Sequence, residues 1–250
     1  MNQSKGRPIL LNSISIQAIL EGRKTQTRRV LKFPSSPGWL QFVEHQSLKA
    51  VYPMPMGGWV FWDSDVGQDF SDRAYPNGQS GFCCPYGQNG DLLWARETWQ
   101  LMVTRWDYDV EEAESIPKTI PQGGGMLIYK VDDPKAAKWW RPSIFMPRWA
   151  SRIILSIVKT RIERLQAISE TDAKAEGVAQ NWIGDNANAV CSIPPEYENE
   201  YRNYAELGSD NFPCNSARES YQTLWDRINK KRGWPWAINP WVWVIEFKVI

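Results

Sequence analysis

The chain has 250 residues, of which 42% are hydrophobic and 23% are charged. This apolar content is enough for a packed core and argues against wholesale disorder. Its 29 basic and 28 acidic side chains nearly cancel, which argues against a protein that coats duplex nucleic acid non-specifically. Any nucleic-acid role must therefore depend on a local patch or a pocket.

The first predicted elements are a strand at Ile9–Leu11 and a helix that continues to Leu20. Ser13 is suited to cap this helix and Gly22 to end it. The next segment, 23–30, carries Lys, Thr and Arg almost exclusively. Residues 33–88 are rich in Pro and Gly and have no sustained period, which predicts an irregular insertion, usually functional or a lid.

The rest of the chain alternates between strand and helix patterns, with a second irregular insertion at 181–213. The predicted strands are Leu92–Arg96, Met126–Lys130, Ile153–Val158 (continuing as one strand or a strand pair through Arg161–Leu165) and Trp241–Ile250, and the predicted helices are Ser169–Gly177 and 216–231. Strands at both ends and in the middle argue against repeated βαβ units. They predict an α+β domain with a curled, mainly antiparallel sheet.

Several chemistries lack their sequence signature. The chain has no P-loop, GxGxxG, HExxH or GxSxG motif, and its only histidine is His45. Its four cysteines have no CxxC spacing, so we expect no metal and no cofactor, with a four-thiolate site as the alternative. No stretch approaches the roughly 20 apolar residues of a membrane span and no secretory h-region is present, which predicts a cytoplasmic protein without a membrane partner.

The segment 22–29, with the sequence GRKTQTRR, holds four cations within seven residues. Their mutual repulsion lowers the pKa of the most buried amine, which is one way in which a lysine becomes a base near neutral pH. Lys24 would be that base and Thr27, three residues later, its nucleophile. The alternative is that these cations only bind phosphate or solvent.

Basic side chains also concentrate in residues 1–32 and 141–165, and these two segments would form one positive face if they met in the fold. The chain has 15 tryptophans, of which many must be core residues. Trp139, Trp140 and Trp149 lie beside basic residues, as in a platform on which bases stack. Ordinary solvated charges and core packing are the alternatives.

The segment 18–28, with the sequence AILEGRKTQTR, resembles the signature of the ASCH domain, a branch of the PUA-like superfamily. The closing pattern of strand, short helix, second helix and final strand is also similar. Further blocks resemble the larger ASCH proteins of phages and prophages: CPYG at 84–87, GD at 90–91, WARETW at 94–99, WRPS at 140–143 and MP at 146–147. The matching blocks cover a little under half of the chain.

The resemblance implies one domain over residues 1–250, a β-barrel of five to six mainly antiparallel strands with flanking helices, and a cleft for a nucleobase or nucleoside. One branch of the family removes the acetyl group from N4-acetylcytidine with a Lys, a Thr and a Glu. These residues fall on Lys24, Thr27 and Glu176. We therefore expect an amidohydrolase acting on an N4-acylated cytidine or a related modified nucleoside, although this chain is much longer than those enzymes.

Two other interpretations stay open. The protein is a non-catalytic binder of single-stranded RNA or DNA, or of a modified base, with a ribonuclease as a variant; or it is a phage accessory protein with a vestigial pocket. The residues predicted to bind substrate or nucleic acid are Arg23, Arg28, Arg29, Arg96, Glu97, Trp99, Trp140, Arg141, Arg148 and Trp149.

Overall fold

The computed structural model describes residues 6–32, 84–102, 125–180, 201–205 and 213–250, and the backbone alone of strand residues 48–53, 59–63, 68–69, 103–104 and 110–112. Most of the predicted insertion at 181–213 and His45 lie outside these residues. Among the described helices, none has the length and apolar character needed to cross a membrane.

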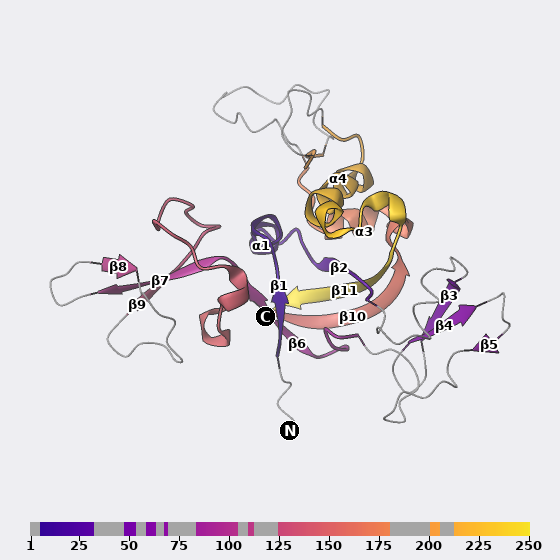
Figure 1. The fold of residues 1–250 in the computed structure, drawn as a ribbon, viewed down its shortest axis with the longest axis horizontal. Helices are drawn as coiled ribbons and strands as arrows, with labels where there is room; N and C mark the ends of the chain where they lie inside the picture. The colour runs from indigo at the N-terminus through magenta and orange to yellow at the C-terminus, as the bar shows by residue number, and fades with distance from the viewer. Residues whose placement is uncertain are drawn as a thin grey trace.

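A five-stranded sheet lies at the centre, in the order β1-β6-β10-β11-β2 (Figure 1). Its strands are β1 (Arg7–Leu10), β2 (Gln26–Val30), β6 (Leu92–Arg96), β10 (Ile154–Arg164) and β11 (Trp241–Val249). β1 and β6 run parallel, and the other three neighbouring pairs are antiparallel. The sheet thus brings the start, the middle and the end of the chain together.

The longest pairing joins β10 and β11, from Leu155 opposite Val249 to Arg164 opposite Trp241. Its register shifts between Ile157 and Lys159. An extra residue in one strand bends that strand and increases its twist. Figure 1 shows both strands curving on the side where α3 and α4 lie.

The α-helices of the described chain are α1 (Ser13–Leu20), α3 (Glu170–Ala175) and α4 (Ala217–Asn229). Each begins where a side-chain oxygen accepts a hydrogen bond from a backbone N–H of the first turn. These cap residues are Asn12, Ser169 and Ser216. The sequence predicted the last two helices, but the first helix is capped by Asn12 and not by Ser13.

β11 is buried on both faces, because side chains alternate across a strand. Trp243, Ile245 and Phe247 pack in one cluster together with apolar side chains of α1. Val242 and Val244 pack in a second cluster together with side chains of α3 and α4. Full burial of such side chains stabilises the fold by about 1.5–3 kcal/mol each. β11 therefore connects the core cluster that includes α1 to the core cluster that includes α3 and α4.

Two smaller sheets extend from the centre. One has the order β3-β4-β5, with β3 (Leu48–Pro53), β4 (Trp59–Asp63) and β5 (Gln68–Asp69), and the other has the order β8-β7-β9, with β7 (Trp99–Thr104), β8 (Val110–Glu112) and β9 (Gly125–Tyr129). The prediction of an irregular segment over residues 33–88 was therefore wrong for the three strands within it. A segment rich in Pro and Gly can therefore still contain strands.

The described structure is α+β with a mainly antiparallel central sheet, as the sequence predicted. The segments 153–158 and 161–165 form the single strand β10 rather than a strand pair. In the described residues β1 and β2 are the two edges of the sheet. The closed barrel therefore stays a prediction.

Candidate functional site

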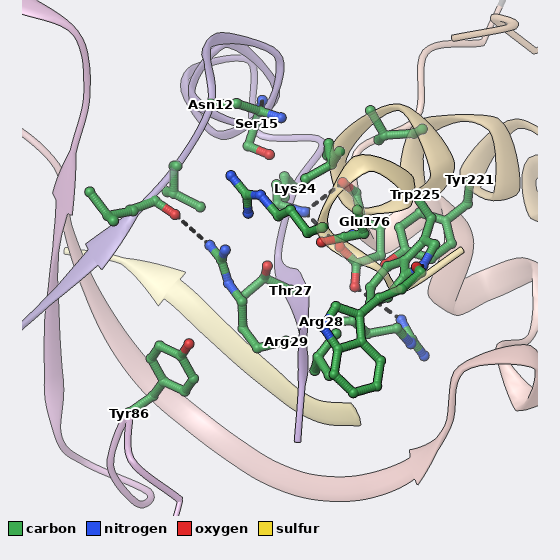
Figure 2. Close-up of a pocket in the computed structure, with 18 of the residues that line it drawn as sticks. Asn12, Ser15, Lys24, Thr27, Arg28, Arg29, Tyr86, Glu176, Tyr221 and Trp225 are labelled. Carbon is green, nitrogen blue, oxygen red and sulfur yellow. Dashed lines mark hydrogen bonds and ion pairs between the residues drawn. The ribbon is translucent and has the colours of Figure 1, made fainter. Parts of the chain in front are cut away.

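A cavity of about 730 Å³ lies between β1, the start of α1, β2 and the C-terminal half of α4 (Figure 2). Small-molecule sites in proteins typically have volumes of about 300–1,000 Å³. Lys24, Thr27 and Glu176 all line this cavity, although they come from distant parts of the sequence. The structure thus brings together the three residues that the resemblance singled out.

Lys24 and Glu176 form a buried ion pair at the cavity. The Lys24 ammonium donates to Oε2 of Glu176 at 2.7 Å and to the Glu176 carbonyl oxygen at 2.8 Å. Both side chains are 3% exposed. The two residues also form an antiparallel backbone bridge, and the Thr25 N–H donates to the Ala175 carbonyl at 2.9 Å. The backbone therefore presets the distance between amine and carboxylate.

Gly177 permits this close approach of the chain after α3 to the chain after α1. Its φ of +85° is in the left-handed region that favours glycine. A Cβ atom here would lie 2.7 Å from the Ala18 Cβ and 2.8 Å from the Lys24 Cβ. A side chain at this position would therefore push the Lys24 segment away from Glu176.

Thr27 lies on β2, where its partner across the sheet is Ile245 of β11. Its side chain is buried, and Figure 2 shows the hydroxyl in the cavity between Arg29 and the Lys24–Glu176 pair. Thr27 and Arg29 share one face of β2, because side chains two residues apart in a strand point the same way. The hydroxyl is thus held by a rigid strand rather than by a loop.

Arg28, the residue between Thr27 and Arg29 on β2, also lines the cavity and enters a network of carboxylates. Its guanidinium donates to Oε1 of Glu176 at 3.1 Å, to Asp172 at 3.3 Å and to Glu163. Arg161 joins the network by donating to Asp172 at 3.0 Å and to Glu163 at 3.1 Å. The two basic segments of the sequence do meet here, but carboxylates balance their charges, so this contact is no positive face.

Burial lowers the pKa of the Lys24 ammonium below its ordinary value, against the opposing charge and hydrogen bond of Glu176. The positive charges of Arg29 and Arg28 lower the pKa further. The direction agrees with the prediction from clustered cations, but desolvation is the larger cause. A lowered pKa makes the neutral amine, which is the basic form, easier to reach near neutral pH.

Aromatic side chains of the α4 region form another wall of the cavity. Tyr221, Trp225 and Trp234 line it, and Tyr86 contributes from the chain before β6. Burial raises the pKa of the Tyr221 hydroxyl well above its usual value, so Tyr221 stays a neutral phenol. The sequence placed Tyr221 and Trp225 on the buried face of an amphipathic helix, but its periodicity does not separate core residues from cavity-lining residues.

Three residues predicted to line the cleft near β6 do not line this cavity. Glu97 is buried in an ion pair with Arg152, at 2.9 Å between Nε and Oε1. Arg96 stacks over the Trp94 ring at 4.6 Å and donates to the Ile144 carbonyl at 3.0 Å. Trp99, the first residue of β7, is fully buried in a small core cluster.

The residues predicted as a basic and aromatic binding platform also lie outside the cavity lining. Arg141 is buried and donates to Gln100 at 2.8 Å. Trp149 packs edge-on against Trp99 with 5.9 Å between ring centroids, and Trp140 donates to the Pro134 carbonyl at 3.2 Å. Arg148 is exposed beside the Trp94 ring.

Arg23 is the one predicted binding residue of segment 22–29 that does not line the cavity. Its guanidinium contacts the Glu21 carboxylate and the Gly177 carbonyl oxygen. Arg23 therefore ties the end of α1 to the chain after α3.

In the described part of the chain, no three His, Cys, Asp or Glu side chains are grouped to hold a metal ion. Cys84 and Cys214 are buried in different core clusters, and Cys83 and Cys191 lie outside the described residues. The separation of Cys84 from Cys214 argues against the alternative of a four-thiolate site.

No protein-family model, no curated protein and no solved structure significantly matches this chain. A functional assignment therefore depends on the cavity, its chemistry and the motif around Lys24.

Proposed function

We propose that this protein is an amidohydrolase that removes an acyl group from an N4-acylated cytidine or a related modified nucleoside. The observation that carries the proposal is one cavity lined by a buried amine, a hydroxyl and a carboxylate, with Lys24 2.7 Å from Glu176 and Thr27 beside them. The proposal includes the ASCH assignment and a PUA-like barrel built on the five-stranded sheet.

The Lys24–Glu176 pair supplies both the base and the acid. At 2.7 Å, moving one proton from the ammonium to the carboxylate converts the charged pair into a neutral amine and a carboxylic acid. Burial lowers the pKa of Lys24 and so favours the neutral amine. The net charge of the site does not change in this step.

The Thr27 hydroxyl then attacks the acyl carbonyl carbon, and the neutral Lys24 amine takes the hydroxyl proton. The bond between the acyl carbon and N4 breaks, and the Glu176 carboxylic acid gives its proton to N4. The acyl group is now an ester on Thr27. Water, deprotonated by a Lys24 amine that has again passed its proton to Glu176, attacks this ester, and the released Thr27 oxygen takes a proton from the pair.

The test is turnover of N4-acetylcytidine, followed by chromatography of cytidine and acetate. We expect wild-type protein to release both in equal amounts. Thr27→Val keeps the shape of the side chain but removes the nucleophile, and Lys24→Met removes the base. Each is expected to lower kcat/KM by at least about a thousandfold, in line with the loss of a nucleophile or its base.

Thr25→Val is the matched control, because Thr25 belongs to the same motif but its side chain is exposed. This variant should keep turnover within about threefold. Failure of the wild-type protein to release cytidine from any acylated cytidine would count against the proposal, as would full activity of Thr27→Val.

A protein that binds a modified base without turnover is the second candidate. The observation in its favour is the aromatic wall of Tyr221, Trp225 and Trp234, since aromatic faces bind bases by stacking at about 1–3 kcal/mol per base. For this candidate, nucleoside affinity would be measurable and Thr27→Val would leave it unchanged, with no cytidine released.

A further inference from the structure

The described residues that line the cavity include five cations but a single carboxylate, Glu176. Lys24 and Arg28 are both paired with Glu176. Arg29, Lys32 and Arg232 have no ion pair with a carboxylate among the described residues. The unbalanced charge of the cavity lining is therefore positive.

Arg29 is held in place beside the start of α1. One of its terminal nitrogens donates to the Leu10 carbonyl at 2.6 Å, two residues before the helix cap at Asn12. Figure 2 shows its side chain in the cavity, next to Thr27. Its Nε–H is buried and has no hydrogen-bond partner in the described structure. A buried donor without a partner costs free energy, and a ligand acceptor would remove that cost.

Arg232 reaches the same cavity from another element, the 3₁₀ turn η6 (Lys230–Arg232) that follows α4. The positive charge of Arg232 lowers the pKa of Arg29, in addition to the larger effect of burial. The two guanidinium groups thus line the same cavity and carry charges of the same sign. An anion between them converts this repulsion into two attractions.

The start of α1 adds a third source of positive potential. Asn12 and Ser15, the N-cap residue and a first-turn residue of this helix, both line the cavity. The first backbone N–H groups of a helix and its dipole favour a negative charge at this end. Arg29, Arg232 and the start of α1 thus all line the cavity, as does Ser15, and Arg29 lies next to the start of the helix.

We propose that this region binds a phosphate group of the substrate, so that the enzyme prefers a nucleotide to the free nucleoside. This inference rests on the proposed function, because the base must then reach Lys24, Thr27 and Glu176 within the same cavity. Guanidinium groups bind phosphate oxygens through charge-assisted and often bidentate hydrogen bonds. The phosphate is a terminal monoester or a diester within a strand, and the experiment separates the two.

The test is titration calorimetry at one fixed, low salt concentration with cytidine, cytidine 5′-monophosphate, a cytidine dinucleotide and inorganic phosphate. We expect the monophosphate to bind at least about tenfold more tightly than cytidine, because a hydrogen bond to a charged group typically lowers the dissociation constant by about this factor or more. Inorganic phosphate should compete with the monophosphate. A dinucleotide that binds more tightly than the monophosphate would assign the site to a strand.

Arg232→Met and Arg29→Met should each move the affinity ratio of monophosphate to cytidine towards one. Lys159→Met, which removes an exposed cation outside the cavity lining, should leave the ratio unchanged. Equal affinities for cytidine and its monophosphate, or an unchanged ratio in both arginine variants, would overturn the phosphate site. Because binding is measured without turnover, an inactive protein that still prefers the monophosphate would count against the hydrolase alone.

Discussion

Lys24 has an unusual environment for a charged side chain. It is almost fully buried, it contacts two oxygens of Glu176, and two arginines follow it within five residues. Desolvation and the arginine charges favour the neutral amine, whereas Glu176 favours the ammonium. The balance lowers the pKa of Lys24, which is the property that a lysine base needs.

This environment predicts the pH dependence of turnover. Turnover needs one proton on the Lys24–Glu176 pair, which Glu176 gives to N4. We therefore expect kcat/KM for N4-acetylcytidine to fall as the pH rises through the pKa of Lys24, below the ordinary lysine value of 10.5. Arg29→Met removes a positive charge that lowers this pKa, so the falling limb should move to higher pH. The measurement is a pH–rate profile for the wild-type protein, Arg29→Met and the Lys159→Met control.

The quantity to compare is the pH at which the limb lies and not the size of kcat/KM, because Arg29 also lines the cavity and its loss can change kcat/KM directly. A limb that moves to lower pH in Arg29→Met, or that moves equally in Lys159→Met, would contradict the role given to Lys24.

At the scale of elements, the site depends on the crossing of two short connections. The chain between α1 and β2 carries Lys24, and the chain after α3 carries Glu176 and Gly177. The sequence predicted both helices and placed Gly22 and Gly177 at their ends. It did not predict that the two connections pair, because a backbone bridge between residues 152 positions apart has no local signal.

Gly177→Ala tests the importance of this crossing, and Gly22→Ala is its matched control. Both glycines have a positive φ, of +85° and +74°, so each alanine incurs the left-handed cost of about 1–2 kcal/mol. Only the alanine at 177 meets neighbouring atoms closer than 3.0 Å, whereas nothing lies within 4 Å of a Cβ at Gly22. Urea unfolding should give a further loss of about 1–3 kcal/mol for Gly177→Ala.

Turnover should also fall more in Gly177→Ala than in Gly22→Ala, because the clash separates Lys24 from Glu176. Equal stability and equal turnover of the two variants would mean that the close approach at Gly177 does not position the pair.

At the scale of the whole molecule, the sequence predicts the α+β class, the helices around residues 13–20, 170–175 and 217–229, and every strand of the central sheet except β2. Lys24, Thr27 and Glu176 were selected by motif, and the fold brings them to one cavity. Arg232 and Tyr86 were missed, because a single Arg or Tyr far from the motif carries no sequence signal. Trp99 and Glu97 were misplaced, since a strand pattern does not say which face lines a cavity.

The charge distribution also becomes interpretable only in the fold. The sequence shows near-neutral charge and two basic segments. In the structure, carboxylates neutralise Arg28 and Arg161, whereas Arg29 and Arg232 keep their charge towards the cavity. Composition alone cannot tell an arginine that is neutralised by a carboxylate from one that is not, because the difference depends on which acidic residues the fold places nearby.

The most direct test of the central claim is the mass of the protein during turnover. Wild-type protein mixed with N4-acetylcytidine and quenched in acid within milliseconds to seconds should gain the mass of one acetyl group. Peptide mapping should locate this group on Thr27, and Thr27→Val should show no gain. Release of cytidine without acetylation of Thr27, and at an unchanged rate in Thr27→Val, would contradict the account.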